Sequence, residues 1–127
     1  MYVKWKETIM KFIDREKVKC ISKKGYTAQI FLDFKEEGNN SRFVLVRMSQ
    51  HTEIKAHYHK KIKEILYFTK GTGTININCI ERRFRPEDII LIEPEDTHSM
   101  INDTDEIAEW LEFKMNDPKE NDLFFVD

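Results

Sequence analysis

The sequence predicts an all-β fold, either a sandwich or a barrel. Short runs of β-branched and aromatic residues recur along most of the chain, and polar turn residues separate them about every eight to twelve positions. The chain has 127 residues, which is the length of one domain, and it contains no internal repeat and no linker rich in Gly, Pro or Ser. We therefore expect residues 1–127 to form a single domain.

The expected strands follow one another from residue 26 onward, and turn residues bound each of them. Residues 35–41, which include Gly38, Asn39 and Asn40, are expected to form the turn between the first two strands. Residues 89–92 form a continuous apolar run, which is typical of a strand buried on both faces. The strands are expected over residues 26–34, 42–49, 64–70, 74–78, 82–85, 89–92, 98–102 and 107–115.

The two ends of the chain need separate treatment. Residues 4–16 have apolar side chains at helical spacing, so a short helix is one possibility, and extended structure up to about Cys20 is the other. Residues 123–127 are too apolar for a free tail, and we expect them to pack on the barrel or on a partner subunit. The residues at helical spacing are Trp5, Ile9, Phe12 and Ile13.

Composition and charge exclude several classes of function. The chain carries 21 basic and 23 acidic residues, and this near balance argues against nucleic acid as the main partner, because such binding depends on a basic surface. The N-terminal segment is charged throughout, unlike a signal peptide, and no apolar run approaches the length that crosses a bilayer. Cys20 and Cys79 form no metal-binding or redox pair and fit a reducing compartment. We therefore expect a cytoplasmic protein that binds neither nucleic acid nor membranes.

The residues that carry chemistry are centred on His57, His59 and Glu64. Residues two apart in a strand point to the same face, so the two imidazoles would project to one side, at a spacing that suits a shared metal ion. A bend after His59 would bring Glu64 back beside them, and His98, just past an acidic turn, is a fourth candidate. A pair of histidines on one strand face is, by itself, more often a surface or core feature. Three imidazoles and one carboxylate together suit Fe, Mn, Ni, Zn or Cu better than Mg or Ca, which prefer oxygen ligands.

The spacing of these residues resembles the first motif of the cupin superfamily. That motif has a Gly, five residues, two histidines separated by one residue, a Glu after three or four more, and a closing Gly six residues further on. His57, His59 and Glu64 occupy the two His positions and the Glu position. Gly71 stands at the closing Gly, whereas His51 replaces the opening Gly.

The second cupin motif is matched only in part. His98 and Asn102 occupy its His and Asn positions, but Glu87, Glu93 and Glu95 stand where the motif has Gly, Pro and Gly. Gly is favoured where the backbone has a positive φ. These departures therefore imply either a strained left-handed residue or a different turn.

The resemblance implies a small conserved β-barrel of jelly-roll (cupin) type, similar to the RmlC-like cupins. The core barrel would span about residues 42–115, with an N-terminal extension over residues 1–25. The resemblance also implies a homodimer, which is frequent in that superfamily. The cofactor it implies is one divalent transition metal (Fe, Mn, Ni, Zn or Cu) on His57, His59, Glu64 and His98.

Three residues are candidates to act on a bound ligand. Glu64 could leave the metal and act as an acid or base, and no other general base is identified. Arg47 could enter the barrel and bind a substrate carboxylate or phosphate, unless it lies on an exposed sheet face. Asn102 would follow His98 on the same face and could hydrogen-bond a ligand or the backbone. The residues expected to line the barrel are Leu66, Phe68, Met100, Trp110 and Phe113.

Three functions are consistent with this sequence. The first is a metal-dependent enzyme that acts on a small oxygenated organic molecule, by isomerisation of a sugar or keto acid or by dioxygenation. The second is a non-catalytic module that binds a small ligand with the help of the metal. The third uses no metal and relies on His57 or His98 as an acid–base residue. Turnover of any substrate would separate the first function from the second.

Overall fold

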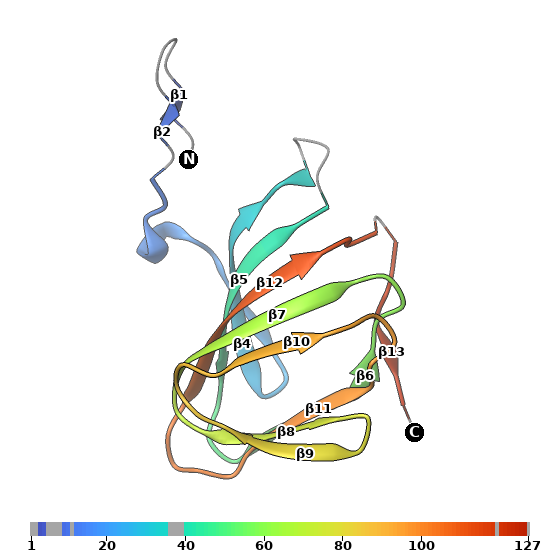
Figure 1. Ribbon diagram of the computed structural model, residues 1–127. Coiled ribbons are helices and arrows are strands. Elements are labelled where there is room, and N and C mark those ends of the chain that lie inside the picture. Colours follow the sequence, from blue (N-terminus) through green and yellow to red (C-terminus); the bar gives the residue numbers. More distant parts are fainter. Residues whose placement is uncertain (1–2, 5–8, 11, 36–39, 119, 127) are drawn as a thin grey trace.

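The computed structural model describes residues 3–4, 9–10, 12–35, 40–118 and 120–126. All strands from β3 onward form two antiparallel sheets that face each other (Figure 1), which confirms the expected all-β barrel of jelly-roll type. One sheet contains β3 (Cys20–Lys23), β4 (Tyr26–Asp33), β5 (Arg42–Met48), β7 (Lys63–Lys70), β10 (Ile89–Ile92) and β12 (Ala108–Met115). The other contains β6 (Thr52–Tyr58), β8 (Gly73–Ile77), β9 (Ile80–Phe84), β11 (His98–Asn102) and β13 (Phe124–Phe125). The strand orders are β10-β7-β12-β5-β4-β3 and β13-β6-β11-β8-β9.

The two ends of the chain behave differently. Near the N-terminus, the short strands β1 (Val3–Lys4) and β2 (Ile9–Met10) pair with each other, and a 3-10 turn follows at Arg15–Lys17. The described part of residues 4–16 therefore favours the extended alternative over a helix, while Trp5 lies outside the described residues. At the C-terminus, β13 pairs with β6, so the apolar end of the chain packs on the barrel, as expected. No helix in the described ranges has the length and apolar character to span a membrane.

Aromatic side chains fill one end of the barrel interior, which we call the apolar end (Phe68, Phe84 and Trp110). Phe68 stacks on Phe84 across the two sheets with ring centroids 4.1 Å apart, and Trp110 lies 5.7 Å from Phe68. Each of the three is at most 1 % exposed. Burying an aromatic side chain stabilises a fold by about 3 kcal/mol, so these contacts hold the two sheets together. The buried positions of Leu66, Phe68, Met100 and Trp110 agree with the predicted lining.

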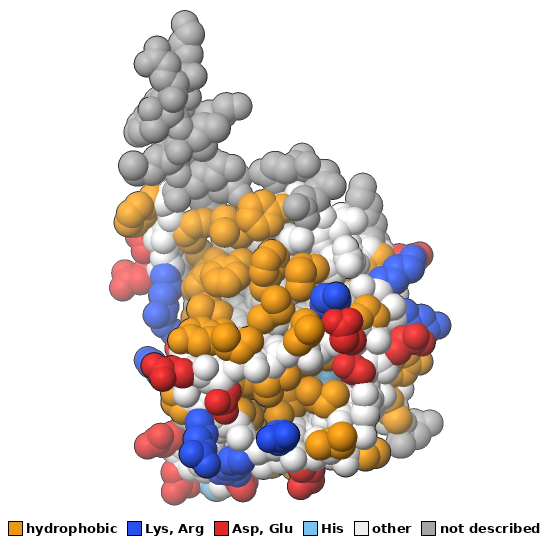
Figure 2. Space-filling model, viewed as in Figure 1, with side chains coloured by type: hydrophobic (Ala, Val, Ile, Leu, Met, Phe, Trp, Pro, Cys, Tyr) orange, Lys and Arg blue, Asp and Glu red, His pale blue; other side chains and the backbone are white. Residues whose placement is uncertain are grey.

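Two predictions of burial are wrong, the burial of residues 89–92 on both faces and the position of Phe113 in the barrel lining, because these side chains point to a part of the outer face that the described residues leave exposed. Ile89 and Leu91 are 67 % and 51 % exposed, since β10 is an edge strand and only its alternate residues face inward. Phe113 is 37 % exposed because it lies three residues from the inward-facing Trp110, and side chains in a strand alternate between faces. Figure 2 shows apolar side chains gathered over this outer face.

The turns at the departures from the cupin motifs keep a left-handed backbone. His51, Glu87 and Glu95 have φ values of 50°, 76° and 72°. The Glu87 N–H donates to the carbonyl of Phe68 at 2.8 Å, which fixes that turn against the sheet. The structure therefore retains the turn geometry and places strained non-Gly residues in it.

Gly71 is a position where only glycine fits. It has a φ of 74°, and a Cβ built there would lie 2.6 Å from the carbonyl oxygen of Ile107. Both facts exclude a side chain, so the closing Gly of the first motif has a structural reason.

Candidate metal centre

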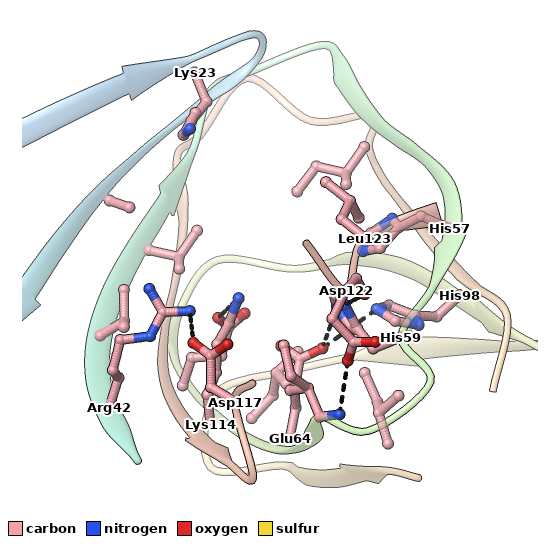
Figure 3. A pocket seen from close by; sticks show the side chains of 18 of the residues that line it. Lys23, Arg42, His57, His59, Glu64, His98, Lys114, Asp117, Asp122 and Leu123 are labelled. Atoms are coloured by element: carbon pink, nitrogen blue, oxygen red, sulfur yellow. Dashed lines mark hydrogen bonds and ion pairs between the residues drawn. The ribbon is translucent and has the colours of Figure 1, made fainter. Parts of the chain in front are cut away.

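Three histidines from two neighbouring strands converge inside the barrel. His57 lies near the end of β6 and His59 follows directly after that strand, while His98 begins β11 and is paired with His57 across the two strands. Their ligand nitrogens all lie within 4.8 Å of one another. Figure 3 shows the three side chains grouped on one side of the pocket. The predicted convergence of the histidines is thus found in the structure.

A backbone carbonyl fixes each imidazole through its Nδ1. The partners are the carbonyls of Lys55 for His57 (2.7 Å), Asp122 for His59 (2.7 Å) and Asp96 for His98 (2.9 Å). Because a carbonyl only accepts, each Nδ1 must carry the proton. In the neutral rings, every Nε2 is then a free lone pair directed into the site. Such outer hydrogen bonds orient the histidines that bind metals.

Glu64, near the start of β7, completes the cluster and is only 3 % exposed. Its Oε1 lies 3.0 Å from Nε2 of His59 and 3.6 Å from Nε2 of His98. The same oxygen is buried and has no hydrogen-bond partner among the described residues. An acceptor left unpaired in a buried site is costly. A shared cation would satisfy the carboxylate and the lone pairs together, so this donor set fits a divalent transition metal.

Burial and the Glu64 carboxylate set the protonation of the site. Burial, with His98 nearby, lowers the pKa of His57 to about 4. Burial also lowers the pKa of His98. At His59 burial is outweighed by the adjacent Glu64 carboxylate, which raises the pKa of that imidazole. Burial disfavours the Glu64 anion, but His59 and Lys114 outweigh it and hold the Glu64 pKa well below its usual range. At neutral pH, neutral His57 and His98 and anionic Glu64 are the forms that bind metals.

Asp122 anchors the C-terminal segment to this site, a role that sequence reasoning missed. Its carboxylate accepts hydrogen bonds from the backbone N–H groups of Lys60, Lys61 and Ile62, in the bend between His59 and Glu64. Its carbonyl orients His59, as described above. The bend and the final segment therefore hold the two ligand candidates in place together.

The site opens into a cavity of about 440 Å³, whose opposite wall carries charged residues that sequence reasoning also missed. Glu112 and Lys114 of β12 and Arg42 of β5 line it. Burial raises the pKa of Glu112. Burial disfavours the Lys114 cation, but the neighbouring Glu112 and Glu64 outweigh this effect and raise its pKa. The available signal was the alternation of Trp110, Glu112 and Lys114 on one face of a predicted strand.

The structure does not bring the two candidate substrate-binding residues to the cavity. Arg47 belongs to the opposite face of β5, where its Nε pairs with Glu109 at 3.0 Å, so a direct role in substrate binding does not fit its position. Asn102 is fully buried, and its Nδ2 donates to the carbonyls of Met48, Ser49 and Glu106. Asn102 thus bonds to the backbone, which was the second of its two predicted roles.

Comparison with known proteins agrees with this architecture. The family model described as the cupin domain matches residues 44–114, more than half of the chain. No curated protein matches it. The polyketide cyclase RemF from Streptomyces resistomycificus superposes with a TM-score of 0.78 at 16 % identity, over 93 % of this chain and 86 % of that one. KdgF from a Halomonas species gives 0.72 at 15 % identity, over 84 % and 95 % of the two chains.

An RmlC-like cupin from Shewanella frigidimarina is similar as well, with a TM-score of 0.73 at 14 % identity over 85 % of this chain and 92 % of that one. At such identities, the likeness to solved structures shows a shared fold alone. The match to the cupin-domain model, together with the two facing sheets and the three converging histidines, shows that this chain belongs to the cupin family.

Proposed function

We propose that the protein is a metal-dependent cupin enzyme that acts on a small oxygenated organic molecule. One divalent transition metal would be held by His57, His59, Glu64 and His98. The observation that carries this proposal is the convergence of three oriented imidazoles, two of which lie within 3.6 Å of the buried Oε1 of Glu64. A metal bound there would supply Lewis-acid chemistry at a substrate oxygen, or a centre for reactions of O₂.

The cavity supports a small-molecule substrate. Its volume of about 440 Å³ is within the usual range for sites that bind small ligands. The lining divides into apolar residues, such as Leu66, Met100 and Trp110, and a group of charged residues. The carbon skeleton of a substrate would then lie against the apolar residues, and its oxygens would lie against the charged residues.

Two carboxyl groups in this cavity have pKa values shifted in opposite directions, which favours an isomerase-type reaction over dioxygenation. Burial raises the pKa of Glu112, while the imidazoles and Lys114 hold Glu64 anionic. Groups with separated pKa values are the usual basis of acid–base catalysis. Glu112 is thus the candidate acid of the pair, and Glu64 is the candidate base. A non-catalytic cupin would use the same site to hold a ligand, and turnover distinguishes the two functions.

Metal content tests the proposal. We would purify the untagged protein without chelator and measure bound transition metals by plasma mass spectrometry. We expect about one equivalent in the wild type and less than a tenth of that in the His57→Ala/His59→Ala variant. His51→Ala is the matched control, because the side chain of His51 is 62 % exposed and pairs with Asp105 instead of lining the cavity. Wild-type protein that takes up no metal after reconstitution with Fe, Mn, Ni, Zn and Cu would overturn the proposal.

The homodimer implied by the family resemblance stays a prediction. The exposed apolar residues Ile89, Leu91 and Phe113 on the outer face of the six-stranded sheet support it. Analytical ultracentrifugation tests it. We expect a dimer in the wild type and a monomer for Leu91→Lys, whereas a monomeric wild type at all concentrations would contradict the prediction.

A further inference from the structure

A row of charged side chains crosses the cavity wall beside the candidate metal centre. Lys114 of β12 is paired with Glu64 of β7 on one side and with Arg42 of β5 on the other. We call these three residues the charged row. All three line the cavity, and Figure 3 shows Arg42 and Lys114 across the pocket from His57 and His98. Side chains paired in this way have Cβ atoms about 5 Å apart, so the row leads from the metal ligands to the far wall.

The two cations of this row have hydrogen-bond donors that find no acceptor among the described residues. Nζ of Lys114 lies 3.6 Å from Oε2 of Glu112, which is too long for a hydrogen bond. Arg42 pairs with Asp117 through Nη2, but its buried Nε has no partner among the described residues. A buried donor without an acceptor is costly, by about 1–3 kcal/mol. A ligand that brings oxygen acceptors to this wall would remove that cost.

The charges around the row limit what such a ligand can be. Glu112 lies beside Lys114, and Asp117 lies beside Arg42, so each cation already has one acidic neighbour. The carboxylates of Asp117 and Glu64, at the two ends of the row, would repel the double charge of a phosphate group more strongly than the single charge of a carboxylate. The planar guanidinium and the ammonium also match the two oxygens of a carboxylate.

We infer that the cavity binds a small organic acid, whose carboxylate lies against Lys114 and Arg42 while an oxygen at its other end lies at the metal centre. The second half of this inference rests on the proposed function. Neighbouring strands are about 4.8 Å apart, so the backbone of Arg42 is about 10 Å from that of Glu64. With long side chains reaching inward from both, an acid of roughly three to five carbon atoms spans the distance.

Calorimetric titration with matched ligands tests the inference. Malonate, succinate and glutarate would each be titrated into metal-loaded protein, and the neutral diamide of the same length would be titrated in parallel. We expect the preferred diacid to bind at least about tenfold more tightly than its diamide, because charge-assisted hydrogen bonds contribute more than neutral ones. Lys114→Met should remove this difference and keep the metal content. Lys70→Met, at an exposed position on the same sheet, should preserve the difference.

The outcomes separate the two proposals. Equal affinity for diacid and diamide, no binding of any diacid, or tighter binding of inorganic phosphate would overturn the organic-acid inference. The protein could instead take up no metal and still bind a diacid, with a binding that Lys114→Met abolishes. This result would overturn the proposed function and support the carboxylate site. If Lys114→Met does not fold, Arg42→Gln serves as the second variant and should lower the affinity for the diacid but not for the diamide.

Discussion

Two rows of side chains on the same three strands differ in every chemical respect. At the apolar end, Trp110 of β12 is paired with Phe68 of β7 and Val46 of β5, and all three are at most 4 % exposed. Four residues further along β12, Lys114 is paired with Glu64 and Arg42. Both rows point inward, because residues at even spacing share a face of the sheet. Strand alternation therefore determines which residues point into the interior. The chemical character of the side chains in a row determines whether that row stabilises the fold or binds a ligand.

The largest expected effect is on stability at the apolar end. Phe68→Ala would leave a cavity beside Phe84 and Trp110 and should lower the free energy of unfolding by about 3–5 kcal/mol. Chemical denaturation followed by fluorescence measures this loss. Ile80→Ala, at a position on β9 that is 66 % exposed, is the matched control and should cost less than about 1 kcal/mol. Similar losses for the two variants would contradict the contrast between inner and outer faces.

Glu64→Gln should separate binding from stability at the charged end. Loss of the carboxylate ligand should weaken metal binding by about 100-fold or more, measured by competition with a chelator. The free energy of unfolding of the metal-free protein should fall by about 1–3 kcal/mol, because the variant removes an anion that His59 and Lys114 favour in the folded protein. Glu81→Gln, at an exposed position on β9, should change neither quantity. Unfolding of the metal-free Glu64→Gln variant would show that Glu64 is structural.

Asn102→Ala should affect the fold and leave the site intact. Asn102 donates to three backbone carbonyls, and its Oδ1 accepts from the N–H and hydroxyl of Thr104. Leaving those buried groups unpaired should cost about 2 kcal/mol in thermal or chemical denaturation. Metal and diacid affinities should match those of the wild type. A loss of ligand affinity without a loss of stability would show that Asn102 takes part in ligand binding.

The smallest expected effect comes from a turn that departs from the cupin motif. Glu87 has a φ of 76°, and a glycine there would relieve the steric cost of a left-handed side chain. Glu87→Gly should raise the free energy of unfolding by about 0.5–1 kcal/mol and leave metal content unchanged. A decrease in the free energy of unfolding would instead mean that contacts of the Glu87 side chain stabilise the turn.

The sequence was sufficient to predict the residues whose positions a short motif defines. His57, His59 and Glu64 could be located because their spacing depends only on strand alternation and one bend, whereas His98 was located through the second cupin motif. The positive φ values at His51, Glu87 and Glu95 show that the left-handed turns of the motifs are kept as well. The motif does not specify which residues line the cavity wall opposite the histidines.

The charged row could not be predicted, because it depends on the register between strands that are far apart in the sequence. Glu64, Lys114 and Arg42 meet only once β5, β7 and β12 are aligned. The face of Arg47 was ambiguous for a related reason. Both faces of β5 carry apolar residues, because the outer face of the sheet is apolar too, so hydrophobic alternation did not tell inside from outside.

X-ray absorption spectroscopy of the metal-loaded protein tests the central claim most directly, because it counts the ligands of the metal. We predict three imidazole nitrogens and one carboxylate in the wild-type spectrum, and three imidazoles without the carboxylate in Glu64→Gln. A spectrum with fewer than two imidazoles, or one with sulfur ligands, would show that the metal binds elsewhere and would contradict the assignment of His57, His59, Glu64 and His98 as its ligands.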